Sequence, residues 1–446
     1  MDFKQHFKKN LSLAYPVMIS HLGQVSVQIA DNMMVGRLGR EPLAAASFAN
    51  SIFVVFLVMG IGMSYAITPM AAQADGEKNI SKLSDILKHG FLVNTLYGIL
   101  LAACIFLSQN GLHYFNQPEM VVTLALPYLS IVGASLIPFL MYQACRQFAE
   151  GLGYTRSAMY ITVASNLLNV LLNYILIFGK LGFAPMGLFG AGLATLISRI
   201  AMAIMMIAFV YFDKKFIAIW QKFNFDRFSW PLIKANLRLG LPMSFQLIFE
   251  VSTFSVAAVM IGWMGTIELA AHQIAISMAS ASYMVALGIS AAATIRVGNQ
   301  LGQRNYQTMR NAALTCFVMA IVFMALAALL FILGRNVLPM LYIDDKAVIG
   351  QAALLLIVAG LFQLSDGIQV VGLGALRGMS DVKVPTVITL IAYWAIGLPL
   401  GYLFGFTLGF GAIGIWYGLL AGLSIAAVLL FIRFNNLSKK LLLSKV

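Results

Sequence analysis

Charged residues are scarce in this chain: Asp, Glu, Lys and Arg together make up 10% of its 446 residues, while hydrophobic residues make up 61%. A typical soluble domain carries about 25% charged residues. A chain with so little charge cannot cover a surface that faces water. The composition therefore excludes a soluble globular protein and indicates that most of the surface faces lipid.

Cysteine is equally scarce, and its spacing excludes two kinds of site. Cys104, Cys145 and Cys316 are isolated residues within or beside apolar runs. An odd number of distant cysteines predicts no disulfide framework, and their spacing fits no metal site. Phosphate-binding loops and nucleophile motifs are also missing from the sequence. We therefore expect neither an enzyme nor a bound cofactor.

The chain has instead twelve apolar runs that each reach the length of about 20 residues at which a tilted helix crosses a bilayer. The runs lack the alternation of membrane strands, and only helices or closed barrels satisfy the backbone in lipid. The sequence predicts an all-α integral membrane protein with twelve transmembrane helices. The predicted spans are 12–35, 43–72, 87–108, 121–144, 157–179, 188–212, 237–262, 269–297, 308–333, 350–375, 384–404 and 410–432.

The net charge of +13 orients the chain in the membrane. With the N-terminus inside, nearly all Lys and Arg fall on the inner side of the predicted spans. Arg199 lies within a span, and the only basic residues outside are Arg37, Arg40, Lys180, Arg335 and Lys346. This distribution follows the positive-inside rule and predicts a multi-pass protein of the cell (inner) membrane with both termini cytoplasmic. The positive charge is thereby explained without a nucleic-acid partner.

The two halves of the sequence repeat each other. A shift of 226 positions aligns Leu11–Asn79 with Leu237–Asn305 without a gap, and about 19 of the 69 pairs are identical. Six spans per half give both halves the same orientation, which predicts two six-helix lobes related by a parallel pseudo-twofold repeat. We predict an N-terminal lobe over residues 1–212, a cytoplasmic inter-lobe linker over 213–236 and a C-terminal lobe over 237–446.

Only three acidic residues lie deep within the predicted spans: Asp31, Glu250 and Asp366. An ionised acid at the bilayer centre costs at least about 2.5–3.5 kcal/mol on insertion scales. No Lys or Arg in a neighbouring span lies deep enough to neutralise Glu250 or Asp366. Each of these two acids must bind a cation, hold a proton or face water, and the alternative is a permanently protonated structural acid.

Polar residues share helical faces with these acids, at spacings of three or four residues. The stripes are His21, Gln24, Gln28 and Asp31 in the first span, and Thr162, Asn166, Asn169 and Asn173 in the fifth. Amides and hydroxyls beside a carboxylate can coordinate a hard cation through oxygen. The alternative is interhelical hydrogen bonding that holds the bundle together. Candidate cavity-lining residues are Gln24, Gln28, Gln246 and Gln363.

Arg199 and His272 are the remaining polar residues of interest within the spans. Arg199, near the middle of the sixth span, could pair with an acid or extend toward the interface, and the sequence leaves both interpretations open. His272 fits a packing role better than a ligand role.

Motifs in both halves resemble those of the multidrug and toxic compound extrusion (MATE) family, NorM-type branch. They are Phe249-Glu250-Val251, Ser365-Asp366-Gly367-Ile368-Gln369-Val370 with Gly374-x-x-Arg377-Gly378, the run LAAHQIAISMAS with SAAATIRVGNQLG, and the first-half echo LAAASFANS with QADG. The match covers nearly the whole length. The resemblance implies a two-lobed antiporter that exports hydrophobic organic cations such as drugs and dyes, and admits Na⁺ or H⁺, by rocking alternating access.

The resemblance also implies roles for particular residues. Glu250 and Asp366 fall on the acids of the C-terminal lobe that bind the coupling cation, so Na⁺ would bind there. Asp31, together with Asn169, Asn173 and Thr195, falls on a cluster in the N-terminal lobe that binds a cation or a proton. Two departures stand out: some relatives carry Asp at the position of Asn173, and Phe362 replaces an aromatic hydroxyl one turn before Asp366.

Other functions fit the sequence less well. A lipid-linked oligosaccharide flippase of the same superfamily is the main alternative, but it needs bases in its cavity for a pyrophosphate, and Arg199 is the only candidate. A channel would carry rings of like charge or a filter motif, which the sequence lacks. We expect a functional monomer in membrane lipid. Na⁺ and H⁺ coupling are both left open.

Overall fold

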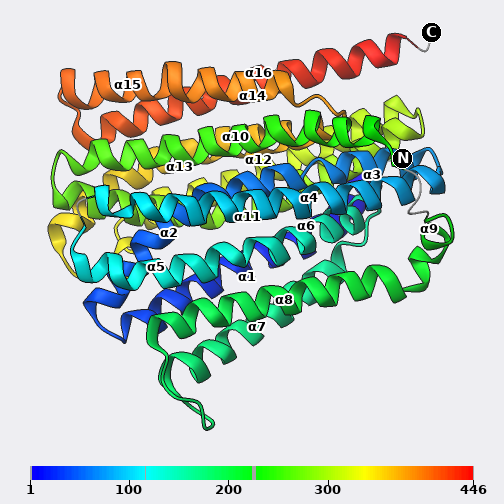
Figure 1. Cartoon of the computed structure of the whole chain (residues 1–446). Coiled ribbons are helices and arrows are strands. Elements are labelled where there is room, and N and C mark those ends of the chain that lie inside the picture. The colour runs from blue at the N-terminus through cyan, green and yellow to red at the C-terminus, as the bar shows by residue number, and fades with distance from the viewer. Residues whose placement is uncertain (1–2, 116, 224–227, 445–446) are drawn as a thin grey trace. The chain divides into compact units, whose positions relative to one another are not determined.

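The computed structural model describes residues 3–115, 117–223 and 228–444, and these residues are almost entirely helical, with no strand among them. The predicted all-α class is confirmed. The helices of the first half (Figure 1) are α1 (Phe3–Gly36), α2 (Arg40–Ser64), α3 (Ile67–Gly76), α4 (Ile80–Ser108), α5 (Glu119–Ala134), α6 (Leu136–Gly151), α7 (Thr155–Phe178), α8 (Gly187–Phe212) and α9 (Ile217–Gln221). Those of the second half are α10 (Trp230–Gly262), α11 (Thr266–Gly302), α12 (Tyr306–Gly334), α13 (Lys346–Gly378), α14 (Lys383–Leu390), α15 (Leu398–Tyr402) and α16 (Gly411–Leu443).

Eleven helical segments in the described part of the chain are long and apolar enough to cross a membrane, and they correspond to the second to twelfth predicted spans. The predicted first span forms α1, whose 34 residues are also enough to cross a bilayer. Polar residues on one face of α1 make it less apolar than the others. Together, α1 and the eleven segments account for the twelve predicted spans.

The eleventh span changes pitch around a proline. π-Helical segments over Ile391–Gly397 and Leu403–Thr407 flank α15, which contains Pro399. Proline has no backbone N–H and its ring crowds the carbonyl four residues earlier, so the regular ladder cannot continue there. The first π-helical segment carries Tyr393, whose buried hydroxyl donates a hydrogen bond to Gln369 Oε1 (2.6 Å).

The chain divides into two compact units, each described separately below. The N-terminal unit comprises residues 19–244, and the C-terminal unit comprises residues 1–18 with 245–446. The boundaries lie inside α1 and α10, and they are themselves 226 positions apart, the period of the sequence repeat. The division into lobes at 1–212 and 237–446 stays a prediction.

Close packing at two equivalent glycines explains where the unit boundaries fall. In the N-terminal unit, a Cβ at Gly62 of α2 would clash with the backbone of Ser244 in α10. In the C-terminal unit, a Cβ at Gly288 of α11 would clash with Met18 of α1. Gly62 and Gly288 are repeat partners, and so are Met18 and Ser244. The first half of each repeat's opening helix therefore packs into the unit formed mainly by the other repeat.

The repeat extends to details of the backbone. Asn79 caps α4 by accepting a hydrogen bond from the Lys82 amide (2.9 Å), and its partner Asn305 caps α12 in the same way, from the Thr308 amide (3.2 Å). The preceding residues, Lys78 and Arg304, share a left-handed conformation with φ of 55° and 56°. Side-chain caps of this kind satisfy an amide that the first turn of a helix leaves unpaired.

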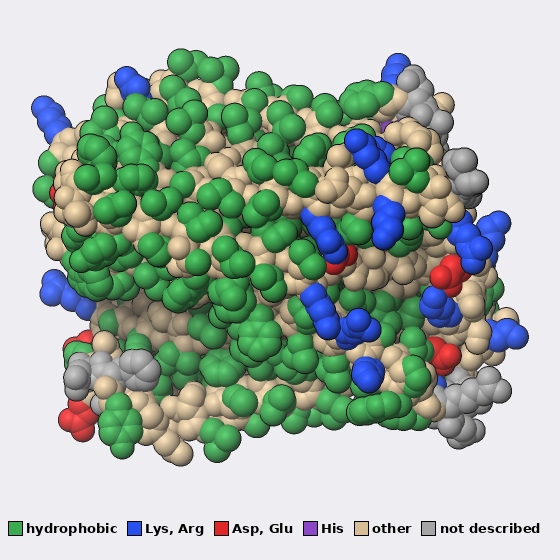
Figure 2. Space-filling model, turned by 90° about the horizontal axis from the view of Figure 1, so that it is seen from above, with side chains coloured by type: hydrophobic (Ala, Val, Ile, Leu, Met, Phe, Trp, Pro, Cys, Tyr) green, Lys and Arg blue, Asp and Glu red, His purple; other side chains and the backbone are tan. Residues whose placement is uncertain are grey.

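Apolar side chains cover most of the surface seen in Figure 2. Large apolar residues are exposed along the helices; the Leu107 and Leu333 side chains are 72% and 75% exposed. Extended apolar surface of this kind is rare on soluble proteins and suits contact with lipid. The helical structure and the apolar surface together confirm a multi-pass membrane protein.

The described part of the predicted linker packs on the N-terminal unit. It contains a 3-10 turn over Lys214–Phe216 and then α9. Phe216 is fully buried, and the Trp220 Nε1 donates a hydrogen bond to the Val210 carbonyl (2.7 Å). Residues 224–227 of this predicted linker lie outside the described residues.

Candidate ion-binding sites

α13 is the central helix of the C-terminal unit, packed against α11, α12 and α16. Asp366 lies at its middle and is 4% exposed. Gln363 and Gln369, one turn before and one turn after it, are fully buried. The polar pattern Gln-x-x-Asp-x-x-Gln on a membrane helix is therefore turned inward, away from lipid, as the insertion cost of polar groups requires.

Glu250 of α10 belongs to the same polar region. Its carboxylate is buried, and Oε1 accepts a hydrogen bond from the Tyr283 hydroxyl of α11 (3.3 Å). Ser282, the residue before Tyr283, donates to Gln363 of α13, one turn before Asp366, so α11 links the two helices that carry the predicted C-terminal acids. Two negative charges near each other in a low-dielectric interior repel strongly. A cation bound at this pair would remove that repulsion.

Three amide side chains surround these acids with unused hydrogen-bonding capacity. Gln363 Oε1 accepts from the Ser282 hydroxyl (2.7 Å), and Gln369 Oε1 accepts from Tyr393. The Nε2 atoms of Gln246, Gln363 and Gln369 are buried without a hydrogen-bond partner. Unpaired buried polar atoms are costly unless water or a ligand satisfies them. Water or another hydrogen-bond acceptor in this region would satisfy these N–H donors.

Arg377 lies near the end of α13, beyond Asp366. Its positive charge acts on Glu250, with burial as the larger influence on that carboxylate. The expectation that no Lys or Arg within a neighbouring span neutralises Glu250 or Asp366 stays a prediction.

The N-terminal unit holds a second cluster around Asp31. Asn173 Nδ2 of α7 donates hydrogen bonds to Asp31 Oδ1 of α1 and to Asn169 Oδ1 (3.1 Å for the latter). Asn169 Nδ2 donates in turn to the Ser198 hydroxyl of α8 (3.2 Å). Thr195, one turn earlier on α8, donates to the Ala191 carbonyl (3.1 Å). The structure thus brings Asp31, Asn173 and Asn169 into one hydrogen-bonded chain, with Thr195 on the adjoining turn.

Arg199, the base within the sixth span, lies in the same unit. Its Nη1 donates to the Ser135 hydroxyl (2.7 Å), and its Cζ lies 5.1 Å from the Phe53 ring centroid and 5.0 Å from the Phe139 ring centroid. Its charge interacts with that of Asp31, but no ion pair within 4.0 Å joins them among the described residues. Neither sequence-based interpretation, direct pairing or extension to the interface, describes this arrangement.

The candidate cavity-lining glutamines differ in their surroundings. Gln246 and Gln363 are buried beside the acids of the C-terminal unit. In the N-terminal unit, Gln24 hydrogen-bonds His21 on its own helix, while Gln28 is exposed. Thr162, from the predicted fifth-span stripe, joins a different network. The stripe is therefore divided between two places, because helical spacing fixes only a shared face and not a shared partner.

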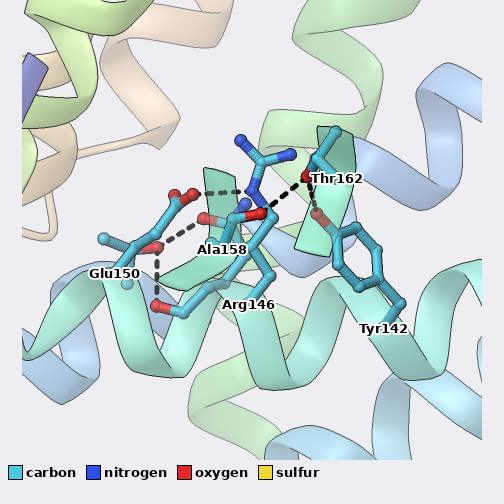
Figure 3. A network of polar contacts seen from close by, with 7 residues as sticks. Tyr142, Arg146, Glu150, Ala158 and Thr162 are labelled. Atoms are coloured by element: carbon cyan, nitrogen blue, oxygen red, sulfur yellow. Dashed lines mark hydrogen bonds and ion pairs between the residues drawn. The ribbon is translucent and has the colours of Figure 1, made fainter. Parts of the chain in front are cut away.

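That other network contains a buried ion pair, which Figure 3 shows from close by. Arg146 Nε of α6 lies 2.6 Å from Glu150 Oε1, and both side chains are nearly inaccessible. The Tyr142 and Thr162 hydroxyls share a hydrogen bond (2.6 Å) on the adjoining turn. The i, i+4 spacing of Arg146 and Glu150 could have revealed the pair, but the sequence interpretation placed Arg146 at the cytoplasmic surface.

Several further contacts were also missed. Tyr283, Ser198 and Ser282 had no distinguishing pattern among the many hydroxyls of the spans. His272 accepts a hydrogen bond from Trp416 (3.1 Å) and is 1% exposed, which agrees with its expected packing role. Phe362 packs against the same tryptophan, with ring centroids 5.9 Å apart.

Comparisons with known proteins match these features. The MatE family model matches residues 16–175 and 242–403. The probable multidrug resistance protein NorM of Mesorhizobium japonicum is 37% identical, with 97% of this chain and 94% of that protein covered. The probable multidrug resistance protein NorM of Rhizobium meliloti is 35% identical, with 98% and 94% covered.

Solved structures share the fold. The crystal structure of MATE in the bent conformation superposes with a TM-score of 0.90 at 20% identity, covering 100% of this chain and 99% of that one. The matched family segments cover most of both repeats, and the relatives align over nearly the whole length. The chain therefore belongs to the MATE family, in its NorM-type branch.

Proposed function

We propose that this chain is a multidrug efflux transporter that exchanges hydrophobic organic cations for Na⁺ or H⁺ across the cell inner membrane, with both termini cytoplasmic. Family membership and the NorM relatives, named as multidrug resistance proteins, support efflux of drugs. The observation that carries the coupling is the burial of two acids, Glu250 and Asp366, in one unit, on helices that α11 links through Tyr283 and Ser282.

The chemistry of exchange follows from competition for these charges. A positively charged drug and a coupling ion both lower the repulsion between the two carboxylates, so occupation by one weakens the binding of the other. Alternating exposure of the pair to the two sides of the membrane then exports the drug and admits the ion. No covalent step is needed.

The free energy available for drug export depends on how many coupling ions enter for each drug molecule that leaves. Exchange of one coupling ion for one singly charged drug moves no net charge, so only the ion gradient drives it. A tenfold gradient then supplies about 1.4 kcal/mol. Each additional ion that enters adds about 2.3 kcal/mol per 100 mV of membrane potential.

Sodium would be held through oxygen, with Glu250 and Asp366 supplying charge and the Tyr283 hydroxyl as a neighbouring oxygen. Hard cations prefer such donors. A proton would use the carboxylates alone. The flippase alternative gains no support, because the guanidinium of Arg199 lies between two aromatic rings and donates to Ser135.

The test is ethidium efflux from proteoliposomes under an imposed Na⁺ gradient or an imposed pH gradient. We expect one gradient to drive efflux, and Glu250→Gln and Asp366→Asn each to lower the driven rate at least about tenfold, which is the loss of about 1.4 kcal/mol. Asp344→Asn, at an exposed acid, is the matched control and should leave the rate unchanged. Full driven efflux in both buried-acid variants would refute the proposal.

A further inference from the structure

The π-helical segment Ile391–Gly397 of the C-terminal unit carries two adjacent aromatic residues, and each donates a hydrogen bond to a different helix. The Tyr393 hydroxyl donates to Gln369 Oε1 of α13 (2.6 Å), and the Trp394 Nε1 donates to the Phe249 carbonyl of α10 (3.2 Å). π-Helical turns are rare in proteins, and those that occur are frequent at functional sites. The segment therefore connects α10 with α13, the two helices that carry the buried acids of this unit.

The contact on α10 fixes the backbone at one of these acids. The Phe249 carbonyl and the Glu250 nitrogen belong to the same planar peptide group. A hydrogen bond to that carbonyl from another helix therefore limits the rotation of α10 at Glu250. The Thr253 hydroxyl donates to the same carbonyl (2.7 Å), and a back-bonding hydroxyl of this kind slightly destabilises a helix. The indole of Trp394 thus supports α10 from another helix at a place where its own backbone ladder is weakened.

The contact on α13 lies one turn after the other acid. Gln369 and Asp366 are three residues apart, so they share a face of α13. Gln369 and Tyr393 are both fully buried, so bulk water does not compete for their hydrogen bond. The ring of Tyr393 also packs against Phe254 of α10, with ring centroids 6.3 Å apart. One residue of the π-helical segment therefore contacts both helices.

The backbone of the segment is itself held by close contact with α16. A Cβ at Gly422 would lie 2.5 Å from the Ala392 carbonyl oxygen, and a Cβ at Gly418 would lie 2.6 Å from the Gly397 carbonyl oxygen. Small residues four positions apart let two membrane helices approach this closely. Because the two aromatic residues are adjacent and their segment is fixed on α16, a shift of α10 against α13 would break one of the two hydrogen bonds.

We propose that Tyr393 and Trp394 form a positioning bracket, which sets the register of α10 against α13 and thereby how tightly the buried acids bind the coupling ion. This role rests on the proposed function, because it acts through Glu250 and Asp366, and neither aromatic residue is a ligand of the ion. A bracket needs both of its ends. Once one hydrogen bond is lost, the other no longer fixes the two helices relative to each other.

The test is ethidium efflux from proteoliposomes, with the concentration of the ion that drives it, Na⁺ or H⁺, varied. Tyr393→Phe and Trp394→Phe each remove one hydrogen-bond donor and keep an aromatic ring. We expect each to raise the half-saturating ion concentration about threefold, the effect of one lost hydrogen bond, and to change the maximal rate less. The double variant should also show a rise of about threefold, because the bracket is already open in each single variant.

Two exposed aromatic residues of the same unit provide matched controls. Tyr402→Phe removes a hydroxyl in the same span, at a side chain that is 53% exposed, and Trp263→Phe removes an indole that is 68% exposed. Both should keep the half-saturating concentration of the parent chain. A merely structural role of the bracket would lower the unfolding temperature and the amount of active protein, which changes the maximal rate and leaves half-saturation as it was.

Two results would overturn the bracket alone. One is an unchanged half-saturating concentration in either Tyr393→Phe or Trp394→Phe, while Glu250→Gln abolishes driven efflux. The other is a rise of about ninefold in the double variant, since independent hydrogen bonds would multiply their effects. Full driven efflux in both Glu250→Gln and Asp366→Asn is a separate result, which refutes the proposed function and, with it, the role of the bracket in ion binding.

Discussion

The two units treat their buried acids in opposite ways. In the N-terminal unit, Glu150 forms an ion pair with Arg146 (2.6 Å). In the C-terminal unit, Glu250 and Asp366 are buried, and no ion pair within 4.0 Å joins either acid to a base among the described residues. One duplicated scaffold therefore carries two electrostatic solutions. Under the proposed function, the exchangeable cation binds in the C-terminal unit.

At one pair of equivalent positions, the two repeats carry charges of opposite sign. Glu150-Gly151 and Arg377-Gly378 correspond at a shift of 227 positions, one more than the shift of the opening spans, and both glycines pack against a threonine of one repeat pair, Thr68 or Thr294. The glycine contact was retained while the neighbouring charge was reversed. Both positions require glycine, because a Cβ at Gly151 or Gly378 would clash with a threonine carbonyl. Packing places no such restriction on the charge of the residue before each glycine.

The largest effect we predict comes from breaking the ion pair of the N-terminal unit. Arg146→Met leaves the Glu150 carboxylate buried and unpaired, which typically costs about 3–5 kcal/mol. We expect a large loss of thermal stability in the purified protein. Arg146→Met with Glu150→Met removes both charges and should recover most of that loss. If the single and double variants are equally unstable, Arg146 contributes through packing and the pair is not an electrostatic unit.

The second prediction tests the same contrast in the C-terminal unit, by placing a fixed positive charge beside its buried acids. Gln246 lies one turn before Glu250, is 1% exposed and has an unpaired Nε2. Gln246→Lys would place an ammonium beside the acid pair and compete with the coupling ion. We expect ion-driven ethidium efflux to fall about thirtyfold, equivalent to about 2 kcal/mol.

Gln246→Met is the control for this substitution, because it keeps a similar size without a charge. It should retain most of the driven efflux. Equal losses in Gln246→Lys and Gln246→Met would show that the amide itself, and not the absence of a local cation, is what the site requires.

A smaller effect is expected at the hydroxyl that contacts Glu250. Tyr283→Phe removes the hydrogen bond to Oε1 (3.3 Å) and keeps the ring. A single hydrogen bond contributes about 0.5–1.5 kcal/mol, which corresponds to a change of about two- to twelvefold in affinity for the coupling ion. The ion concentration that gives half-maximal efflux measures this change. An altered maximal rate with unchanged half-saturation would place Tyr283 in the transport step rather than in ion binding.

The sequence predicted the helices well, because length and apolarity alone decide whether a segment spans a membrane. It also predicted that Asp31, Asn169 and Asn173 share a cluster, since helical spacing and the resemblance agreed. It did not predict the place of Arg199. The rings of Phe53 and Phe139 that enclose it come from other helices, and no local pattern in the sequence connects them to α8.

The same reason applies to other features. The contacts of Glu250 depend on the packing of α10 against α11, where Tyr283 lies. The sequence does not indicate the unit boundaries inside α1 and α10, because a helix is continuous in sequence even where its two halves pack into different units. Side-chain roles within a unit follow from tertiary contacts, which a repeat reveals only where both copies keep the same residues.

The smallest effect we predict is at Thr195, in the N-terminal unit. Thr195→Val removes a hydroxyl that donates to the Ala191 carbonyl of its own helix (3.1 Å). We expect a loss of less than about 0.5 kcal/mol in the free energy of unfolding, because substitutions that break no buried network are usually this small. Thermal unfolding of the purified protein measures the loss. A loss several times larger would show that the Thr195 hydroxyl also supports the hydrogen-bonded chain of Asp31, Asn173 and Asn169, and the N-terminal unit would then hold a second polar group that its stability requires.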